Sequence, residues 1–205
     1  MKGIFVTFEG PDGCGKTTIA SLLYEELKKL NKKVLRTREP GGTEISEKIR
    51  NIILDPQNTK MDYRTEALLY AASRAQHVHE KIIPALEEGY IILCERFVLS
   101  SIAYQGYGRG LGKGVETIND FATGGLKPDL VFLFKVNSEK TLLRKLADGG
   151  DRLEREDISF HKKVQRAYED LSKNKDFQII DASRSIEEVF NECLEKLLEL
   201  IKWNL

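Results

Sequence analysis

The chain has 205 residues, of which 41% are hydrophobic and 31% are charged, so it can bury a core beneath a well-solvated surface. Its 32 basic and 32 acidic side chains give a formal net charge of +0, which argues against a general nucleic-acid binder. The first apolar stretch, which Glu9 interrupts, is too short for a signal peptide, and no run approaches the ~18 apolar residues of a membrane span. We therefore expect a soluble, cytoplasmic protein with no membrane partner.

Short β-branched and aromatic runs alternate with longer helical patterns. The predicted strands are residues 4–8, 34–38, 91–94, 130–136 and 177–180. They show little polar alternation, which is typical of strands covered on both faces. This rhythm predicts one α/β domain over residues 1–205, with a five-stranded parallel sheet and helices on both faces.

The first and last predicted helices are the clearest. A helix over 17–30 has an apolar face, formed by Leu22, Leu23, Leu27 and Leu30. The last helix begins at a capping box, Ser185-x-x-Glu188, and its leucines and Trp203 are predicted to be core.

Two segments break this rhythm. Residues 106–114 are rich in glycine and are predicted to form a loop. Residues 147–157 are charged and interrupted by glycine, between two predicted helices, and we expect them to form a short lid over an active site.

The sharpest motif is Gly10-Pro11-Asp12-Gly13-Cys14-Gly15-Lys16-Thr17, a complete G-x-x-x-x-G-K-[ST] sequence between a predicted strand and a predicted helix. Its glycines let backbone N–H groups surround phosphates, and the helix N-terminus adds positive potential. Lys16 supplies a charge for the β- and γ-phosphates, and the Thr17 hydroxyl can ligate Mg²⁺. The motif predicts nucleoside triphosphate binding and the three-layer sandwich of P-loop NTPases.

Arginines from separate segments converge on the same edge of the predicted sheet. Arg38 ends the second strand, Arg96 follows the third, and Arg144 and Arg152 lie in or before the predicted lid. Several convergent arginines suit a transfer between two phosphorylated partners, where negative charge must be neutralised. A phosphate acceptor needs no strong general base, so a nucleoside-monophosphate kinase is favoured over a hydrolase.

The motifs can be compared with known families as a set. They are the P-loop with Asp12, Arg38-Glu39-Pro40-Gly41-Gly42, Glu95-Arg96-Phe97, Ser101-x-x-Tyr104-Gln105-Gly106 and Asp151-Arg152-Leu153-Glu154. In this order and spacing the set resembles the bacterial thymidylate kinases over nearly the whole chain. The resemblance implies transfer of the ATP γ-phosphoryl group to dTMP, giving dTDP for dTTP synthesis, with Mg²⁺ as cofactor and a homodimer packed through helices.

The resemblance also implies roles for individual residues. The implied catalytic residues are Lys16, Arg96, Arg152 and Asp12. The implied ATP-binding residues are Gly10, Pro11, Asp12, Gly13, Cys14, Gly15, Lys16, Thr17, Thr18, Arg144, Asp181, Ala182 and Ser183. The implied metal-binding residues are Thr17 and Glu95. The implied dTMP-binding residues are Asp12, Arg38, Tyr70, Arg74, Arg96, Ser101, Tyr104 and Gln105.

The implied contacts cover the three parts of dTMP, which are the phosphate, the sugar and the base. Arg38 and Arg96 would hold its phosphate. Asp12 would contact the sugar 3′-hydroxyl, Tyr104 would crowd the 2′ position, and Gln105 would line the same wall. At the base, Tyr70 would stack on thymine, Arg74 would bond its exocyclic oxygen, and Ser101 would meet its polar edge. Residues 70 and 74 lie one helical turn apart and share a face, although without the resemblance the sequence favours core packing for Tyr70.

Three positions distinguish this chain within the resemblance. Gly13 stands where one subgroup has a basic residue, and the charge comes instead from Arg152, as in the bacterial arrangement. Glu95 replaces the usual aspartate. Cys14 replaces a small P-loop residue, and it is either a small buried filler or a thiol that is modifiable in the empty enzyme and protected by ATP.

Other classes stay open at this point. A kinase for another nucleotide would share the P-loop and the arginines. A regulatory GTPase would show an N-K-x-D motif, which this sequence lacks, and a motor ATPase would show a strand ending in a pair of catalytic carboxylates.

Overall fold

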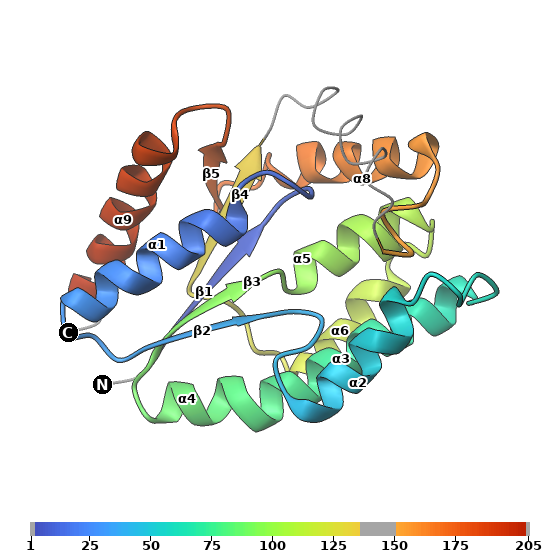
Figure 1. The fold of residues 1–205 in the computed structure, drawn as a ribbon, viewed down its shortest axis with the longest axis horizontal. Helices are drawn as coiled ribbons and strands as arrows, with labels where there is room; N and C mark the ends of the chain where they lie inside the picture. The colour runs from blue at the N-terminus through green and yellow to red at the C-terminus, as the bar shows by residue number, and fades with distance from the viewer. Residues whose placement is uncertain (1–2, 136–150, 204–205) are drawn as a thin grey trace.

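The computed structural model describes residues 3–135 and 151–203. Its five strands form one parallel sheet in the order β2-β3-β1-β4-β5 (Figure 1). The strands are β1 (Ile4–Glu9), β2 (Val34–Arg38), β3 (Ile91–Glu95), β4 (Leu130–Lys135) and β5 (Gln178–Asp181). The predicted sheet is confirmed. Val136, at the predicted end of the fourth strand, lies outside the described residues.

Helices cover both faces of this sheet, and two segments, η1 and η2, are wider π-helices. They are α1 (Lys16–Lys29), α2 (Glu44–Leu54), α3 (Tyr63–His77), η1 (Val78–Ile82), α4 (Ile83–Glu87), α5 (Val98–Ser101), η2 (Ile102–Gly108), α6 (Gly114–Thr123), α8 (Ile158–Leu171) and α9 (Ile186–Trp203). Within the described residues no helix is both long and apolar enough to cross a bilayer.

Polar side chains cap the starts of α8 and α9, and the cap of α9 is the one that the sequence predicts. At α9, the backbone N–H of Ser185 donates to Glu188 Oε2 at 3.0 Å, and the N–H of Glu188 donates back to Ser185 Oγ at 3.3 Å. This reciprocal pair is the predicted capping box. At α8, the Asp157 carboxylate accepts from the N–H of Phe160 at 2.8 Å, which fixes the junction between the predicted lid and the helix.

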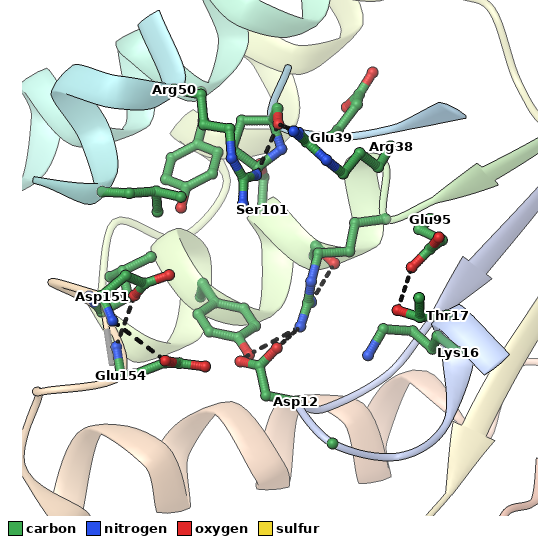
Figure 2. Close-up of a pocket in the computed structure, with 18 of the residues that line it drawn as sticks. Asp12, Lys16, Thr17, Arg38, Glu39, Arg50, Glu95, Ser101, Asp151 and Glu154 are labelled. Carbon is green, nitrogen blue, oxygen red and sulfur yellow. Dashed lines mark hydrogen bonds and ion pairs between the residues drawn. The ribbon is translucent and has the colours of Figure 1, made fainter. Parts of the chain in front are cut away.

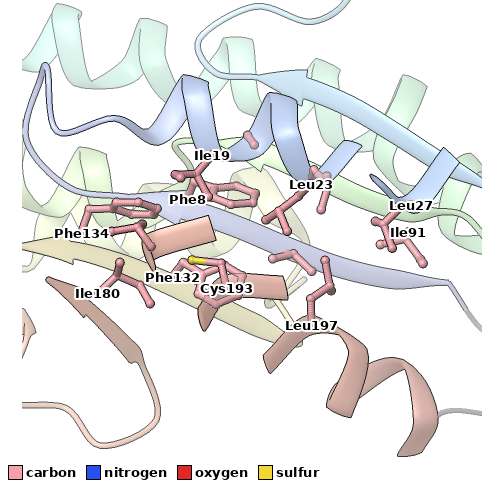
Figure 3. Close-up of a cluster of buried hydrophobic side chains, with 14 of the residues drawn as sticks. Phe8, Ile19, Leu23, Leu27, Ile91, Phe132, Phe134, Ile180, Cys193 and Leu197 are labelled. Carbon is pink, nitrogen blue, oxygen red and sulfur yellow. The ribbon is translucent and has the colours of Figure 1, made fainter. Parts of the chain in front are cut away.

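Alternating side chains of the central strand β1 build the core on both faces of the sheet. Val6 and Phe8 point to the side covered by α1 and α9, where they pack with Leu23 and Leu197 (Figure 3). Phe5 points to the opposite side and packs edge-on against Phe97, with ring centroids 5.0 Å apart. Because both faces are buried, the strand reads as a continuous apolar run in the sequence.

Three predicted core positions are wrong. Leu22 is 39% exposed, Leu30 is 45% exposed and Trp203 is 88% exposed. Leu22 lies off the row that Ile19, Leu23 and Leu27 form at four-residue spacing, and Leu30 stands just beyond the last residue of α1. Leu22 therefore lies on a different face of α1 from the one that is buried, and Leu30 lies outside the helix.

The predicted glycine-rich loop over 106–114 is also only partly present. Gly106 and Gly108 belong to η2, and α6 begins at Gly114. A Cβ on Gly108 would lie 2.6 Å from the ring of Phe160 in α8. Gly108 therefore serves close helix packing and not a flexible turn.

Candidate active site

A cavity of about 490 Å³ opens at the carboxyl ends of the strands, where the P-loop leaves β1. Ligands of open α/β sheets bind at this edge. Figure 2 shows side chains from the P-loop, β2, β3 and the helices beyond them converging on it. The lining residues are Asp12, Gly13, Gly15, Lys16, Thr17, Thr18, Arg38, Glu39, Pro40, Arg50, Leu54, Tyr70, Arg74, Glu95, Arg96, Ser100, Ser101, Tyr104, Gln105, Asp151, Leu153 and Glu154.

The P-loop takes its shape from glycines that no other residue could replace without strain. Gly10 has φ +138°, and a Cβ there would lie 2.7 Å from the carbonyl oxygen of Phe134. Gly15 has φ +88° and precedes the first residue of α1, so the helix N-terminus faces the loop. The result is a concave set of backbone N–H groups with the positive end of a helix dipole behind it.

Lys16 lies across this loop. Its Nζ donates to the carbonyl oxygens of Gly10 at 3.0 Å and Pro11 at 2.6 Å. Burial and the nearby charge of Arg96 lower the pKa of the Lys16 amine, because both disfavour its protonated form. A phosphate anion at the loop would reverse this effect and stabilise the ammonium.

Thr17 and Glu95 meet at the start of α1. The Thr17 hydroxyl donates to Glu95 Oε2 at 2.5 Å (Figure 2). Glu95 Oε1 lies 3.5 Å from Nε of Arg36. The structure thus brings the two residues predicted to bind metal into direct contact. A hydroxyl and a carboxylate are the hard oxygen donors that Mg²⁺ prefers.

Arg96 follows β3 in a backbone conformation that side chains rarely adopt, with φ +66°. Such a conformation costs roughly 1–3 kcal/mol and must be held by its surroundings. The buried carboxylate of Glu9 supplies this support. It accepts from the N–H of Phe97 at 2.7 Å and from the Ser100 hydroxyl at 2.6 Å. Burial raises the pKa of Glu9, although these bonds and nearby arginines oppose the rise.

The Arg96 side chain reaches the middle of the cavity. It pairs with the Asp12 carboxylate and donates to Ser100 Oγ at 2.9 Å. Tyr104 completes the group, because its hydroxyl donates to Asp12 Oδ2 at 2.6 Å. Burial opposes the charge of Arg96, but Asp12 and the neighbouring tyrosines outweigh it and hold the Arg96 pKa above its ordinary value. Three residues predicted to act on dTMP therefore form one contact cluster.

Arg74 lies at the back of the cavity, only 2% exposed. Its Nε donates to Glu39 Oε2 at 2.6 Å. Its Nη1 donates to Ser101 Oγ at 3.0 Å and to Asn119 Oδ1. Its Nη2 donates to the Phe97 carbonyl at 2.9 Å. Among the described residues these contacts use four of the five N–H donors of a guanidinium. The fifth N–H, on Nη2, has no partner among these residues.

The other predicted dTMP contacts also line the cavity. Tyr70 is half-buried on α3, one turn before Arg74, so it contributes to the cavity wall as well as to the apolar cluster around α8. Gln105 is buried in η2 and donates its amide N–H to Glu66 Oε1 at 2.9 Å. Arg38 ends β2, where it pairs with Glu47 at 3.1 Å.

Arg152, predicted to be catalytic, does not reach the phosphate cradle. Its side chain is 8% exposed, and it donates to Glu66 Oε2 at 2.6 Å and to the Ile53 carbonyl at 2.8 Å. Its neighbours Asp151 and Leu153 line the cavity, but Arg152 does not. A buried carboxylate binds a guanidinium strongly, and this pair directs the Arg152 side chain toward Glu66 on α3.

The predicted adenine-side residues lie at the same edge of the sheet without lining the cavity. The N–H of Ala182 donates to the carbonyl oxygen of Lys135 at 2.9 Å, and the Asp181 carboxylate accepts from the N–H of Ser183 at 3.0 Å. The last predicted ATP contact, Arg144, lies outside the described residues, as do 147–150 of the predicted lid.

Cys14 faces the core beneath the P-loop. It is 5% exposed, and its Sγ lies 3.4 Å from Lys16 Nζ. The predicted lysine neighbour is present, but the burial favours the small filler over the modifiable thiol.

Sequence reasoning missed part of the cavity wall. Glu39 follows Arg38 in the motif that ends β2, and its carboxylate pairs with both Arg74 and the buried ring of His77. Arg50 on α2 lines the cavity and donates to the Pro40 carbonyl at 2.8 Å. Nothing in the sequence distinguished Arg50 from the other polar residues of an amphipathic helix.

Comparison with known proteins gives one consistent result. The family model described as "Thymidylate kinase" matches residues 8–193. A thymidylate kinase of Finegoldia magna is 56% identical over 197 residues, covering 95% of this chain and 97% of that protein. A thymidylate kinase of Lactobacillus helveticus is 54% identical over 205 residues, covering 96% of each chain. The crystal structure of thymidylate kinase from Ehrlichia chaffeensis superposes with a TM-score of 0.79 at 31% identity, covering 96% of this chain and 100% of that one. The chain belongs to the thymidylate kinase family.

Proposed function

We propose that the chain transfers the γ-phosphoryl group of ATP to dTMP and releases dTDP, a step in dTTP synthesis. The observation that carries the proposal is that both candidate phosphate sites share one cavity. It joins a P-loop cradle to an arginine-lined chamber, with Arg96 at the junction. A hydrolase needs one polyanion site and a positioned water, whereas this cavity offers cationic groups for two phosphorylated partners.

ATP would lie with its phosphates on the P-loop, between the backbone N–H groups and the Lys16 amine. Thr17 and Glu95 would hold Mg²⁺, directly or through its water shell, and the metal would neutralise charge between the β- and γ-phosphates. Lys16 and Arg96 would neutralise charge on the moving group, and neither residue needs to transfer a proton.

The dTMP phosphate would lie between Arg38 and Arg96, where the acceptor oxygen faces the P-loop. Asp12 and Tyr104, joined by their 2.6 Å hydrogen bond, would meet the sugar at its 3′ and 2′ positions. A hydroxyl at the 2′ position would meet the Tyr104 ring, which supports a preference for deoxyribose. The acceptor phosphate is ionised near neutral pH, so the residues only need to orient it and exclude water.

Thymine would lie against Tyr70, with its edge toward Arg74, Ser101 and Gln105. The remaining N–H of Arg74 would donate to the exocyclic oxygen O4. The amide nitrogen of Gln105 is engaged by Glu66, which leaves its oxygen Oε1 to accept from the ring N3–H. A donor for O4 and an acceptor for N3–H favour thymine over cytosine, which reverses both groups.

We also propose a homodimer packed through α2, α3 and α6, which lie side by side (Figure 1). These helices carry Ile45 and Ile52 at 49% exposure, Leu68 at 55% and Phe121 at 90%. Large apolar side chains gathered on adjacent helices typically mark a protein interface. The chain would act as one kinase domain in each protomer, with the residues around 151–157 at the rim of the cavity. Its free, buried cysteines fit a reducing cytoplasm.

An acceptor panel tests the substrate. ADP release from ATP and Mg²⁺ is measured with dTMP, dUMP, dCMP, dGMP and thymidine in turn. Fast turnover with dTMP, slower turnover with dUMP and none with thymidine are expected. Turnover that favours another monophosphate would overturn the roles of Arg74, Ser101 and Gln105 while keeping the kinase reaction.

A further inference from the structure

Glu66 is a carboxylate with 0% exposure on α3, outside the set of cavity-lining residues. Its Oε1 accepts from Gln105 Nε2 at 2.9 Å and from Arg109 Nε at 3.1 Å. Its Oε2 accepts from Arg109 Nη2 at 2.8 Å and from Arg152 at 2.6 Å. Burying a carboxylate fully costs free energy unless such partners offset it, so the burial of Glu66 depends on these hydrogen bonds.

The surroundings of Glu66 keep it ionised. Burial favours the neutral acid, but the hydrogen bonds from Arg109 and Gln105 and the nearby positive charges prevail and hold the Glu66 pKa below its ordinary value. Arg109 is itself fixed, because its guanidinium lies 4.5 Å from the ring centroids of both Tyr63 and Phe160. Glu66 is therefore a group that accepts hydrogen bonds and donates none.

Because the Glu66 carboxylate only accepts hydrogen bonds, it determines which way the Gln105 amide points. The two arms of a glutamine amide are nearly equal in shape, so an amide in a symmetric site can take either orientation. Here only the nitrogen arm can bond Glu66, and turning the amide over would place two oxygens against each other. The oxygen arm, which accepts no hydrogen bond from the described residues, is left for the cavity that Gln105 lines.

We propose that Glu66 is a positioning residue for base recognition: it locks the Gln105 amide with Oε1 toward the acceptor, so that the site selects a pyrimidine whose N3 carries a hydrogen. This rests on the proposed function, because it concerns how the same cavity reads the base of dTMP. Glu66 would not touch the substrate. It acts through the orientation of one amide.

The test is Glu66→Gln, which keeps the size of the side chain but adds an N–H donor. With glutamine at position 66 the Gln105 amide can turn over, because either of its arms then finds a partner. The probe is 5-methyl-2′-deoxyisocytidine monophosphate. It keeps the methyl group and O4 of dTMP but has an unprotonated N3 that accepts a hydrogen bond. The measured quantity is the ratio of kcat/KM for dTMP to that for this probe, which is independent of the fraction of enzyme that is folded.

The wild-type ratio should be about 10 to 100, the range that one mismatched buried hydrogen bond produces. Glu66→Gln should lower the ratio by about tenfold, and Glu66→Asp, which remains acceptor-only, should keep it. Glu156→Gln is the matched control. Glu156 bonds the same Arg109 at 2.6 Å without touching Gln105, so its neutralisation should leave the ratio unchanged.

A second test places both substitutions in one chain. In Gln105→Leu the amide is gone, so adding Glu66→Gln should no longer change the ratio. An unchanged ratio in Glu66→Gln, or an equal fall in Glu156→Gln, would overturn the positioning role. A wild-type enzyme that fails to phosphorylate dTMP would instead refute the proposed function, so the two failures are distinguishable.

Discussion

The guanidinium of Arg96 pairs with the carboxylate of Asp12 at the point where the P-loop meets the rest of the cavity. The first residue comes from the end of β3 and the second from the P-loop, and 84 positions separate them in the chain. This pair links the two halves of the cavity. It also holds the Arg96 side chain in place before any anion arrives, which reduces the ordering that substrate binding requires.

Replacing Asp12 by asparagine should reveal its contact with the sugar. If its carboxylate accepts from the 3′-hydroxyl, Asp12→Asn lowers kcat/KM for dTMP by about 10- to 100-fold, the worth of a charge-assisted hydrogen bond. Part of any loss would come from Arg96. The comparison is therefore made with 3′-deoxythymidine monophosphate, which lacks the hydroxyl and should be affected much less. Equal losses for both substrates would exclude the sugar contact.

Glu95 should control the Mg²⁺ requirement. Glu95→Gln removes the negative charge but keeps the hydrogen bond with Thr17. It should raise the half-saturating Mg²⁺ concentration by about tenfold or more, because loss of a metal ligand or of its supporting carboxylate typically weakens metal binding by that much. Glu95→Asp keeps the carboxylate and serves as the control, with a much smaller shift. The measurement is initial rate against Mg²⁺ at fixed ATP, and an unchanged requirement in Glu95→Gln would remove Glu95 from the metal site.

The apolar surface of α3 and α6 should control the oligomeric state. Leu68→Glu combined with Phe121→Glu places two charges in the proposed interface and should convert the proposed dimer to a monomer in sedimentation velocity. Trp203→Glu is the matched control, because Trp203 is about as exposed as Phe121 but belongs to α9. A dimer that survives the double substitution, or that Trp203→Glu disrupts, would show that the interface lies elsewhere.

Cys14 should resist thiol reagents in the folded enzyme. It is 5% exposed, and Cys94 and Cys193 are both 0% exposed, so alkylation requires local opening of the structure. Mass spectrometry after labelling should show little modification of Cys14 with or without ATP and rapid modification after denaturation. Fast labelling that only ATP prevents would instead establish the modifiable thiol.

The features that sequence predicted well depend on neighbouring residues. The P-loop is a continuous motif whose backbone geometry follows from its glycines, and the strands are apolar runs because both faces of the sheet are covered. The capping box of α9 is equally local. In each case the signal lies within a run of a few consecutive residues, so it can be recognised from one sequence.

The features that sequence missed depend on distant partners. Glu66 meets Arg109 at a separation of 43 positions and Arg152 at 86, and no pattern in the chain pairs them. The role expected for Arg152 followed its place in a motif, whereas its position in the structure follows this buried carboxylate. Trp203 was assigned to the core by its residue type alone, which cannot distinguish the two faces of a terminal helix.

The central claim is a transfer of phosphorus from ATP to dTMP, and the most direct measurement follows the transferred group. ATP labelled with ³²P at the γ-position is incubated with dTMP and Mg²⁺, and the products are separated. We expect the label to appear in dTDP, in equal amount to the ADP formed, and Lys16→Ala to abolish the transfer. Label that appears as inorganic phosphate, with no labelled dTDP, would contradict the claim.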